Sequence, residues 1–295
     1  MESAGISPVF SNIVKLVSHI FLGLVSIIAA IAAASFITAQ IAPNIIALNV
    51  EQLSTLKAAI NITLTAVFYM AFVRFYEKRA ATELAFAGRR MLYGALLGFA
   101  MLAVPTLMLF ALGNYQVVSD QGMGEMLFVV IGISAIAISE EFIFRAIVFR
   151  VMERYIGTLY ALLFVCFLSI GLTALSGDGI GFNALFSTAL ISALWCSIYI
   201  LTRNIWVVAL HHAAWNYAEF SSGILDEHWR TNAPIISRAE GPQILTGGAF
   251  GPEASILTMI LCAASLLYLY RLLQKLPATA TGKLTGQTVL NTTNW

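Results

Sequence analysis

Charged residues are scarce in this sequence. Asp, Glu, Lys and Arg make up 11% of its 295 residues, 59% are hydrophobic, and the mean hydropathy is +0.85. Soluble globular domains carry about 25% charged residues, so the composition excludes an ordinary soluble domain and indicates a polytopic membrane protein. No polar block is long enough for a second domain, and we expect one integral membrane domain over residues 1–276. The formal net charge of +1 gives no sign of a nucleic-acid partner.

Cysteine pairs and metal-binding motifs are also missing. The three cysteines, Cys166, Cys196 and Cys262, lie in separate apolar runs and form no Cys-x-x-Cys pair. We expect them to be buried hydrophobic residues, not disulfides or metal ligands. No His-Glu-x-x-His motif occurs, and the adjacent His211 and His212 diverge by about 100° on a helix. The sequence therefore predicts no cofactor, and its ligand spacing does not support a divalent metal.

Long apolar runs are abundant. Crossing a bilayer takes about 20 apolar residues. The first run is longer than the apolar part of a signal peptide, about 7–15 residues, so we interpret it as a retained span. Pro105 lies inside the third run and should kink it. The fold class is therefore expected to be an all-α membrane bundle of eight helices: Val17–Ile41, Ala58–Val73, Leu92–Leu112, Met126–Ile147, Leu159–Leu175, Ala184–Leu201, Ile205–Phe220 and Ile256–Leu273.

Lys and Arg concentrate in alternate segments between these runs. The basic segments are residues 74–90, 150–154, 203 and 271–283, and the segments between them carry few Lys or Arg. Because basic loops tend to remain in the cytoplasm, the pattern predicts cytoplasmic termini, with residues 221–253 outside. Residues 277–295 are rich in Thr, Gly and Asn, and we expect a disordered cytoplasmic tail there.

Two adjacent carboxylates lie inside the fourth apolar run. Ionisable residues at such depth are costly and normally mark a functional site. Glu141 and Arg145 are four residues apart with the acid first, which favours an ion pair on a helix. Glu140 points about 100° away from Glu141 and lacks that partner. The pattern indicates one carboxylate that is held in place and one that is available for chemistry.

A second polar group lies in the seventh run. His212 and Asn216 are four residues apart, so both face the same side of a helix. Imidazole and carboxamide groups can donate hydrogen bonds to a developing oxyanion. In isolation, such a pair is more simply explained as two core residues that satisfy each other. The carboxylate pair in another run favours the catalytic interpretation, while His211 points elsewhere and is expected to pack.

At this point the sequence resembles a known family. Glu140-Glu141-x-x-x-Arg145 followed by His212-x-x-x-Asn216 is similar to the motifs of the CAAX prenyl protease and bacteriocin-processing (CPBP) family of intramembrane endopeptidases. The segments Leu201–Trp206 and Thr246–Ser255 also resemble segments of that family, and the resemblance runs over residues 81–273. It implies an eight-span helical fold with a membrane-enclosed site.

The resemblance also implies roles for these residues. Glu140 would match the general base that activates water, with Glu141 and Arg145 in support. His212 and Asn216 would match the pair that stabilises the oxyanion. The family is read as glutamate-dependent without a required metal, and a peptide or membrane-protein substrate and membrane lipids would be its partners.

One position departs from the family pattern. The family carries a Phe-x-x-x-His motif in the helix after the glutamates, and its histidine helps to hold the water. The best match places Ala174 at that histidine, and the sequence has no histidine between His19 and His211. Alanine cannot hold a water by hydrogen bonding. The departure leaves the activity open.

Three functions are therefore compatible with these residues. The first is an intramembrane endopeptidase. The second is a weak or inactive member of the family that acts as a bacteriocin-immunity or scaffold membrane protein. The third is a transporter with a proton relay, although the repeated halves typical of transporters are not evident. The short loops favour a bacterial inner membrane, and the sequence identifies no particular substrate.

Overall fold

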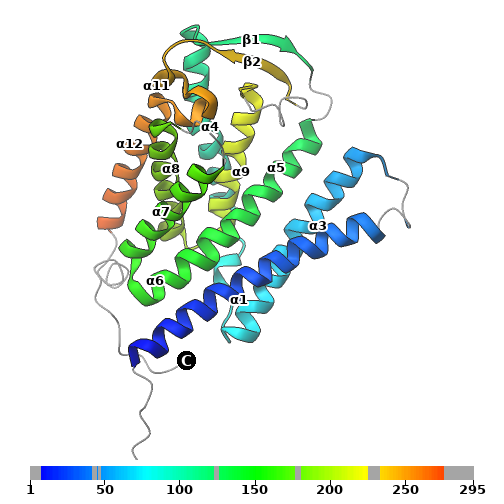
Figure 1. Cartoon of the computed structure of the whole chain (residues 1–295), viewed down its shortest axis with the longest axis vertical. Helices are drawn as coiled ribbons and strands as arrows, with labels where there is room; N and C mark the ends of the chain where they lie inside the picture. Colours follow the sequence, from blue (N-terminus) through cyan, green and yellow to red (C-terminus); the bar gives the residue numbers. More distant parts are fainter. Residues whose placement is uncertain are drawn as a thin grey trace, which may run out of the picture.

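The computed structural model describes residues 8–41, 45, 48–122, 126–176, 181–224 and 233–275. The tail predicted at residues 277–295 lies outside the described residues. Helices dominate the described chain, and a single two-stranded ribbon supplies its sheet (Figure 1). The predicted all-α polytopic bundle is confirmed.

Each predicted apolar run coincides with a helix. Two of these helices end in a π-helical turn, and a third continues through a π-helical stretch into a short helix. The long elements are α1 (Pro8–Phe36, extended by Ile37–Ile41), α3 (Val50–Ala71, extended by Phe72–Tyr76), α4 (Arg89–Ala111), α5 (Met126–Glu141, continued by η4, Phe142–Phe149, and α6, Arg150–Ile156), α7 (Thr158–Leu175), α8 (Phe182–Thr202), α9 (Ile205–Ser222) and α12 (Ile256–Gln274). Pro105 lies inside α4, which remains one helix.

Six of the helical segments are long and apolar enough to cross a membrane: Val9–Ile41, Gln52–Tyr76, Arg89–Ala111, Thr158–Leu175, Phe182–Thr202 and Gly248–Gln274. The count of eight spans is therefore not confirmed. The two helices that fall short, α5 and α9, carry the polar clusters. They pack against each other, and α9 also packs along α4, so most of α9, including His211 and His212, is buried in the bundle.

Two glycines allow α4 and α9 to touch through their backbones. A Cβ atom at Gly98 would lie 2.0 Å from the carbonyl oxygen of His211, and one at Gly94 would lie 2.6 Å from that of Val207. Small residues four apart permit such close helix packing in membranes. This contact holds the backbone of α9 against α4 at His211, next to the residue that enters the site.

The basic segments gather at one end of the bundle. Arg150 pairs with Glu77 at 2.9 Å, and Arg79 pairs with Glu83 at 2.6 Å, so the segment after α3 is held against α6. Burial by itself would raise the pKa of Glu83, but hydrogen bonds from Arg79 and Tyr69 lower that pKa below its ordinary value. Residues of segments that were predicted to share one side of the membrane therefore lie together.

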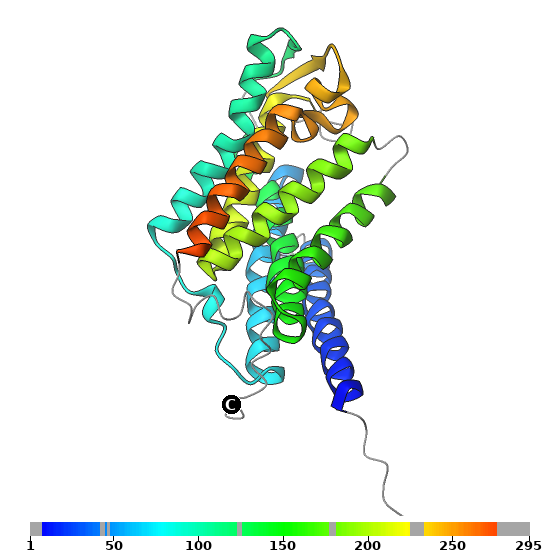
Figure 2. The ribbon, with the colours of Figure 1, turned by 90° about the vertical axis from the view of Figure 1, so that its left-hand side faces the viewer.

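The opposite end carries the strand ribbon and two short helices. β1 (Tyr115–Asp120) pairs antiparallel with β2 (Ile235–Ala239), and α11 (Gln243–Thr246) and η5 (Gly248–Ala254) lead into α12. Figures 1 and 2 place this ribbon at the end remote from α6. The Tyr115 hydroxyl donates a hydrogen bond to the Thr246 carbonyl at 2.5 Å, which ties the ribbon to the turn before η5.

Two of the three cysteines are buried, as predicted. All three are free, with Cys196 and Cys262 buried and Cys166 half-buried. They contribute to helix packing, and none forms a disulfide.

Candidate active site

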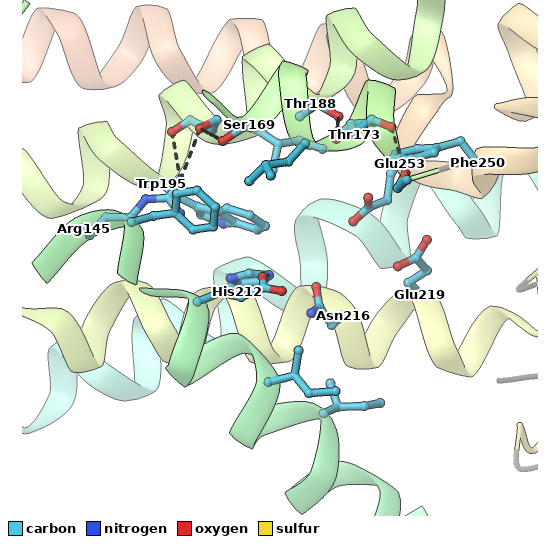
Figure 3. Close-up of a pocket in the computed structure, with 18 of the residues that line it drawn as sticks. Arg145, Ser169, Thr173, Thr188, Trp195, His212, Asn216, Glu219, Phe250 and Glu253 are labelled. Atoms are coloured by element: carbon cyan, nitrogen blue, oxygen red, sulfur yellow. Dashed lines mark hydrogen bonds and ion pairs between the residues drawn. The ribbon is translucent and has the colours of Figure 1, made fainter. Parts of the chain in front are cut away.

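A cavity of about 560 Å³ lies among α5, α7, α8, α9 and η5. Glu140, Arg145, His212 and Asn216 all line it, although they come from segments about 70 residues apart in the sequence. Figure 3 shows His212 and Asn216 projecting from α9 into this space. The structure thus brings both predicted polar clusters to one site.

Glu141 is the fixed carboxylate. Its side chain has no exposed surface, and its Oε1 accepts a hydrogen bond from Arg145 Nη1 at 3.0 Å, so the predicted ion pair is present. The same oxygen lies 2.8 Å from Nδ1 of His212. Because an ionised carboxylate only accepts hydrogen bonds, Nδ1 carries a proton in this contact. Glu141 therefore sets both the tautomer and the orientation of His212.

Glu140 is the accessible carboxylate. Its side chain is 46% exposed and lines the cavity, and its Oε2 lies 3.6 Å from Nε2 of His212. The imidazole is thus placed between two glutamates, one buried behind it and one open to the cavity. The regular α-helix ends at Glu141 and the π-helical stretch begins at Phe142, a feature that is frequent at functional sites.

Trp195 of α8 packs against both His212 and Arg145. Its ring stacks on the His212 ring with centroids 3.7 Å apart, and the Arg145 guanidinium lies 5.3 Å from its centroid. Its indole N–H donates a hydrogen bond to His211 Nδ1 at 3.1 Å. His211 is therefore a buried packing partner, as expected. Trp195 was not predicted as a site residue, because it belongs to neither polar motif and lies in the apolar run before the histidines.

Asn216 and Glu219 continue the same face of α9. Both line the cavity one and two turns after His212, and no described residue hydrogen-bonds the Asn216 carboxamide. Oε1 of Glu219 points toward η5, since it would lie 3.6 Å from a Cβ at Gly251. Spacing alone would have placed Glu219 on this face, because it follows His212 by seven residues.

Glu253 completes this end of the cavity. It precedes α12, and its carboxylate accepts a hydrogen bond from the Trp215 indole N–H, while Ser187 donates to its backbone carbonyl. Figure 3 shows the Glu219 and Glu253 carboxylates directed into the same region. Glu253 lies in the Thr246–Ser255 segment that carries part of the family resemblance, but it was not predicted as a site residue.

The structure does not place Ala174 in the site. Ala174 is exposed, and the face of α7 that lines the cavity consists of Ser169, Leu172, Thr173 and Ser176. Adjacent residues on a helix point about 100° apart, so a one-residue error in matching the motif changes the wall it belongs to. Ser169 and Thr173 are the four-residue pair that faces Glu140 and His212 across the cavity. The helix thus presents hydroxyl groups, and no histidine, at this wall.

Among the residues that the structure describes, no set of three or more His, Cys, Asp and Glu side chains is arranged to hold a metal ion. Glu140 and Glu141 do not form such a set with His212, because the two carboxylates face different nitrogens of the imidazole ring.

Comparison with known families agrees with the geometry. Residues 122–218 match the family described as "Type II CAAX prenyl endopeptidase Rce1-like". Within these bounds the chain is similar to that family. The matched residues include Glu140, Glu141, Arg145, His212 and Asn216, so the family resemblance rests on the same segments that line the cavity. No curated protein matches the chain.

The Rce1-like match names a family of membrane proteases. Together with the long apolar helices, it supports an integral membrane protein.

Proposed function

We propose that this Rce1-like protein is an intramembrane endopeptidase that hydrolyses a peptide bond of a membrane-associated substrate with a water activated by Glu140. One observation carries the proposal: an accessible glutamate and a histidine fixed by a second, buried glutamate line the same cavity. The accessible carboxylate is able to meet a water, while the buried one is occupied by Arg145 and His212.

Glu140 acts as the general base. Its carboxylate takes a proton from water as the water oxygen attacks the scissile carbonyl carbon, and a tetrahedral oxyanion forms. The protonated Glu140 then gives this proton to the leaving amine as the C–N bond breaks, so that a carboxylic acid and an amine are released. Such proton transfer is worth about 10²–10⁴-fold in rate.

His212 and Asn216 stabilise the oxyanion. Glu141 occupies Nδ1 of His212, so Nε2 is the ring nitrogen that faces the cavity. When the ring takes up a second proton as an imidazolium, Nε2–H donates to the oxyanion. The Asn216 amide donates from the next turn of α9. Donors that are held in place before the reaction act most strongly in a site from which water is largely excluded.

Glu141, Arg145 and Trp195 hold the histidine in position. The buried ion pair fixes one edge of the imidazole and the indole covers one face.

We infer that no metal is required, which predicts that peptide cleavage persists in excess chelator. A divalent-metal requirement would appear as loss of activity with chelator and its recovery on adding the metal.

A catalytically weak or inactive protein is the second candidate. The observation that favours it is the wall of α7, where Ser169 and Thr173 face the reacting group in place of a histidine. In that case the fold would serve as a bacteriocin-immunity or scaffold membrane protein. Nothing in the described arrangement of helices favours a transporter with repeated halves.

The test is cleavage of a quenched peptide library by the purified protein in lipid nanodiscs. We expect cleavage by the wild type and a loss of about 10²-fold or more in Glu140→Gln. Glu240→Gln, which alters an exposed glutamate on the segment after β2, is the matched control and should cleave like the wild type. If no peptide is cleaved by the wild type, the second candidate replaces the first.

A further inference from the structure

The cavity has a wall of hydroxyl groups opposite the catalytic side chains. Ser169 and Thr173 of α7 face Ser192 and Thr188 of α8, and all four line the cavity. Oγ of Ser169 lies 3.0 Å from Oγ of Ser192, and Oγ1 of Thr173 lies 3.3 Å from Oγ1 of Thr188. Figure 3 shows Ser169, Thr173 and Thr188 across the cavity from His212 and Asn216.

The two hydroxyl pairs are regularly spaced. α7 and α8 run antiparallel here. Thr173 follows Ser169 by four residues on α7, and Thr188 precedes Ser192 by four residues on α8. Four residues correspond to about 6 Å along a helix axis. In an extended peptide, the N–H and C=O groups that point to one side recur every second residue, about 6.6–6.8 Å apart. The repeat of the hydroxyl pairs therefore approximates the repeat of a peptide edge.

Each pair also has hydrogen-bonding capacity left over. A hydroxyl offers one donor and two acceptor lone pairs, so two hydroxyls bonded to each other retain one donor and several acceptors. Each pair is thus able to accept from a peptide N–H and donate to a peptide C=O. Arg145 Nη2 donates to the backbone carbonyl of Ser192 at 3.2 Å, which fixes this end of the wall to the buried ion pair.

We propose that Ser169, Thr173, Thr188 and Ser192 form a main-chain binding track that holds an extended peptide substrate against the catalytic groups. The proposal rests on the proposed endopeptidase function and names how its substrate is recognised. Unsatisfied backbone groups are costly inside a membrane, so a substrate strand there needs partners along its edge. A track of hydroxyls supplies them without selecting particular side chains.

The competing account is that the hydroxyls only join α7 to α8. Polar side chains often hydrogen-bond between membrane helices. In that case, removing a hydroxyl would lower stability without weakening substrate binding selectively. The two explanations therefore differ in one measurable respect. If a hydroxyl binds a substrate amide, removing both groups should weaken binding no more than removing either one.

The experiment is a double-mutant cycle between protein and peptide. One peptide found by library binding is compared with analogues in which one backbone amide at a time is replaced by an ester, which removes a donor. Binding to wild type and to Thr173→Val, which keeps the side-chain shape, is measured by fluorescence anisotropy. Thr63→Val is the control, because the Thr63 hydroxyl bonds to its own helix on α3, away from the cavity.

We expect one ester to weaken binding to the wild type by about three- to tenfold, the worth of one hydrogen bond. Thr173→Val should weaken binding of the all-amide peptide by a similar factor, and the same ester should then cost nothing further. Thr63→Val should bind all peptides as the wild type does.

Independent, multiplicative losses from the ester and from Thr173→Val would overturn the track, and so would unchanged binding in a folded Thr173→Val. If Thr173→Val does not fold, Thr188→Val removes the same pair from the other helix and is judged by the same cycle. The readout is binding, so it also separates the two proposals. A protein that binds through the track but cleaves nothing keeps the track and loses the endopeptidase function, whereas a protein that binds no peptide loses the track.

Discussion

Glu140 and Glu141 are neighbours in sequence and opposites in environment. Glu141 is fully buried and accepts hydrogen bonds from Arg145 and His212, whereas the Glu140 side chain is 46% exposed and lines the cavity. The i,i+4 spacing predicted this division, because a helix pairs Glu141 with Arg145 and turns Glu140 away.

Arg145 is expected to act on stability as well as on activity. Arg145→Ala leaves Glu141 buried without its cation, and breaking a buried pair in this way costs about 3–5 kcal/mol. Thermal unfolding in detergent should show a clearly lower Tm for Arg145→Ala than for Glu140→Gln. Equal Tm values for wild type and Arg145→Ala would contradict the structural role of the pair.

Asn216 is expected to act on turnover. If its amide stabilises the oxyanion, Asn216→Ala should lower kcat by about 10²–10³-fold with little change in KM. Steady-state cleavage of one peptide measures both values. A raised KM with an unchanged kcat would assign Asn216 to substrate binding instead.

At the residue scale, spacing along the chain predicted which polar residues share one face of a helix. It did not predict the site residues that reach the cavity through packing between helices. Trp195 meets His212 and Arg145 only because α8 packs beside α9 and η4. Ala174 illustrates the same limit, since matching a motif in an apolar helix without its histidine left the register ambiguous by one residue. In the structure Thr173 lines the cavity, whereas Ala174 is exposed.

At the scale of elements, apolar run length predicted where the helices lie, because lipid-facing and buried helices both require hydrophobic side chains. It could not predict the π-helical stretch after Glu141, which leaves no mark in the pattern of apolar residues. It also treated α5 and α9 as ordinary spans, although their polar residues make them the enclosed helices of the site.

The contact between α4 and α9 provides a test at this scale. Gly98→Ala would place a Cβ 2.0 Å from the His211 carbonyl oxygen, so the helices must separate. Overpacking of this kind costs about 1–3 kcal/mol. We expect a lower Tm and a large loss of cleavage, because His212 moves with α9.

Gly132→Ala on α5 is the matched control, since a Cβ there meets no atom within 4 Å. It should leave Tm unchanged or slightly raised, because alanine is the better helix former. A Gly98→Ala protein with wild-type Tm and activity would show that the close approach of the two helices is not needed.

At the scale of the whole molecule, the alternation of basic segments predicted which loops lie together. The segment after α3, the α6 region and Arg203 meet at one end, where Arg203 pairs with Glu153 at 2.9 Å. The ribbon of β1 and β2 lies at the other end (Figure 2). The sequence could not predict this ribbon, since its two strands are joined only by pairing across more than 100 residues.

We predict that the end with the basic segments faces the cytoplasm. In a variant without the native cysteines, Ser119→Cys on β1 should react with a membrane-impermeant maleimide added to intact cells. Lys78→Cys, an exposed position after α3, should react only after the membrane is permeabilised. The reverse labelling pattern would invert the topology.

The central claim is that Glu140 activates a water that cleaves a peptide bond in this cavity. The most direct measurement is single-turnover cleavage in ¹⁸O-labelled water, followed by mass spectrometry of the product that carries the new carboxyl group. We expect one ¹⁸O atom in that carboxyl group for the wild type. For Glu140→Gln we expect a rate at least about 10²-fold lower at an unchanged Tm. A folded Glu140→Gln protein that forms the labelled product at the wild-type rate would rule out Glu140 as the base that activates the water.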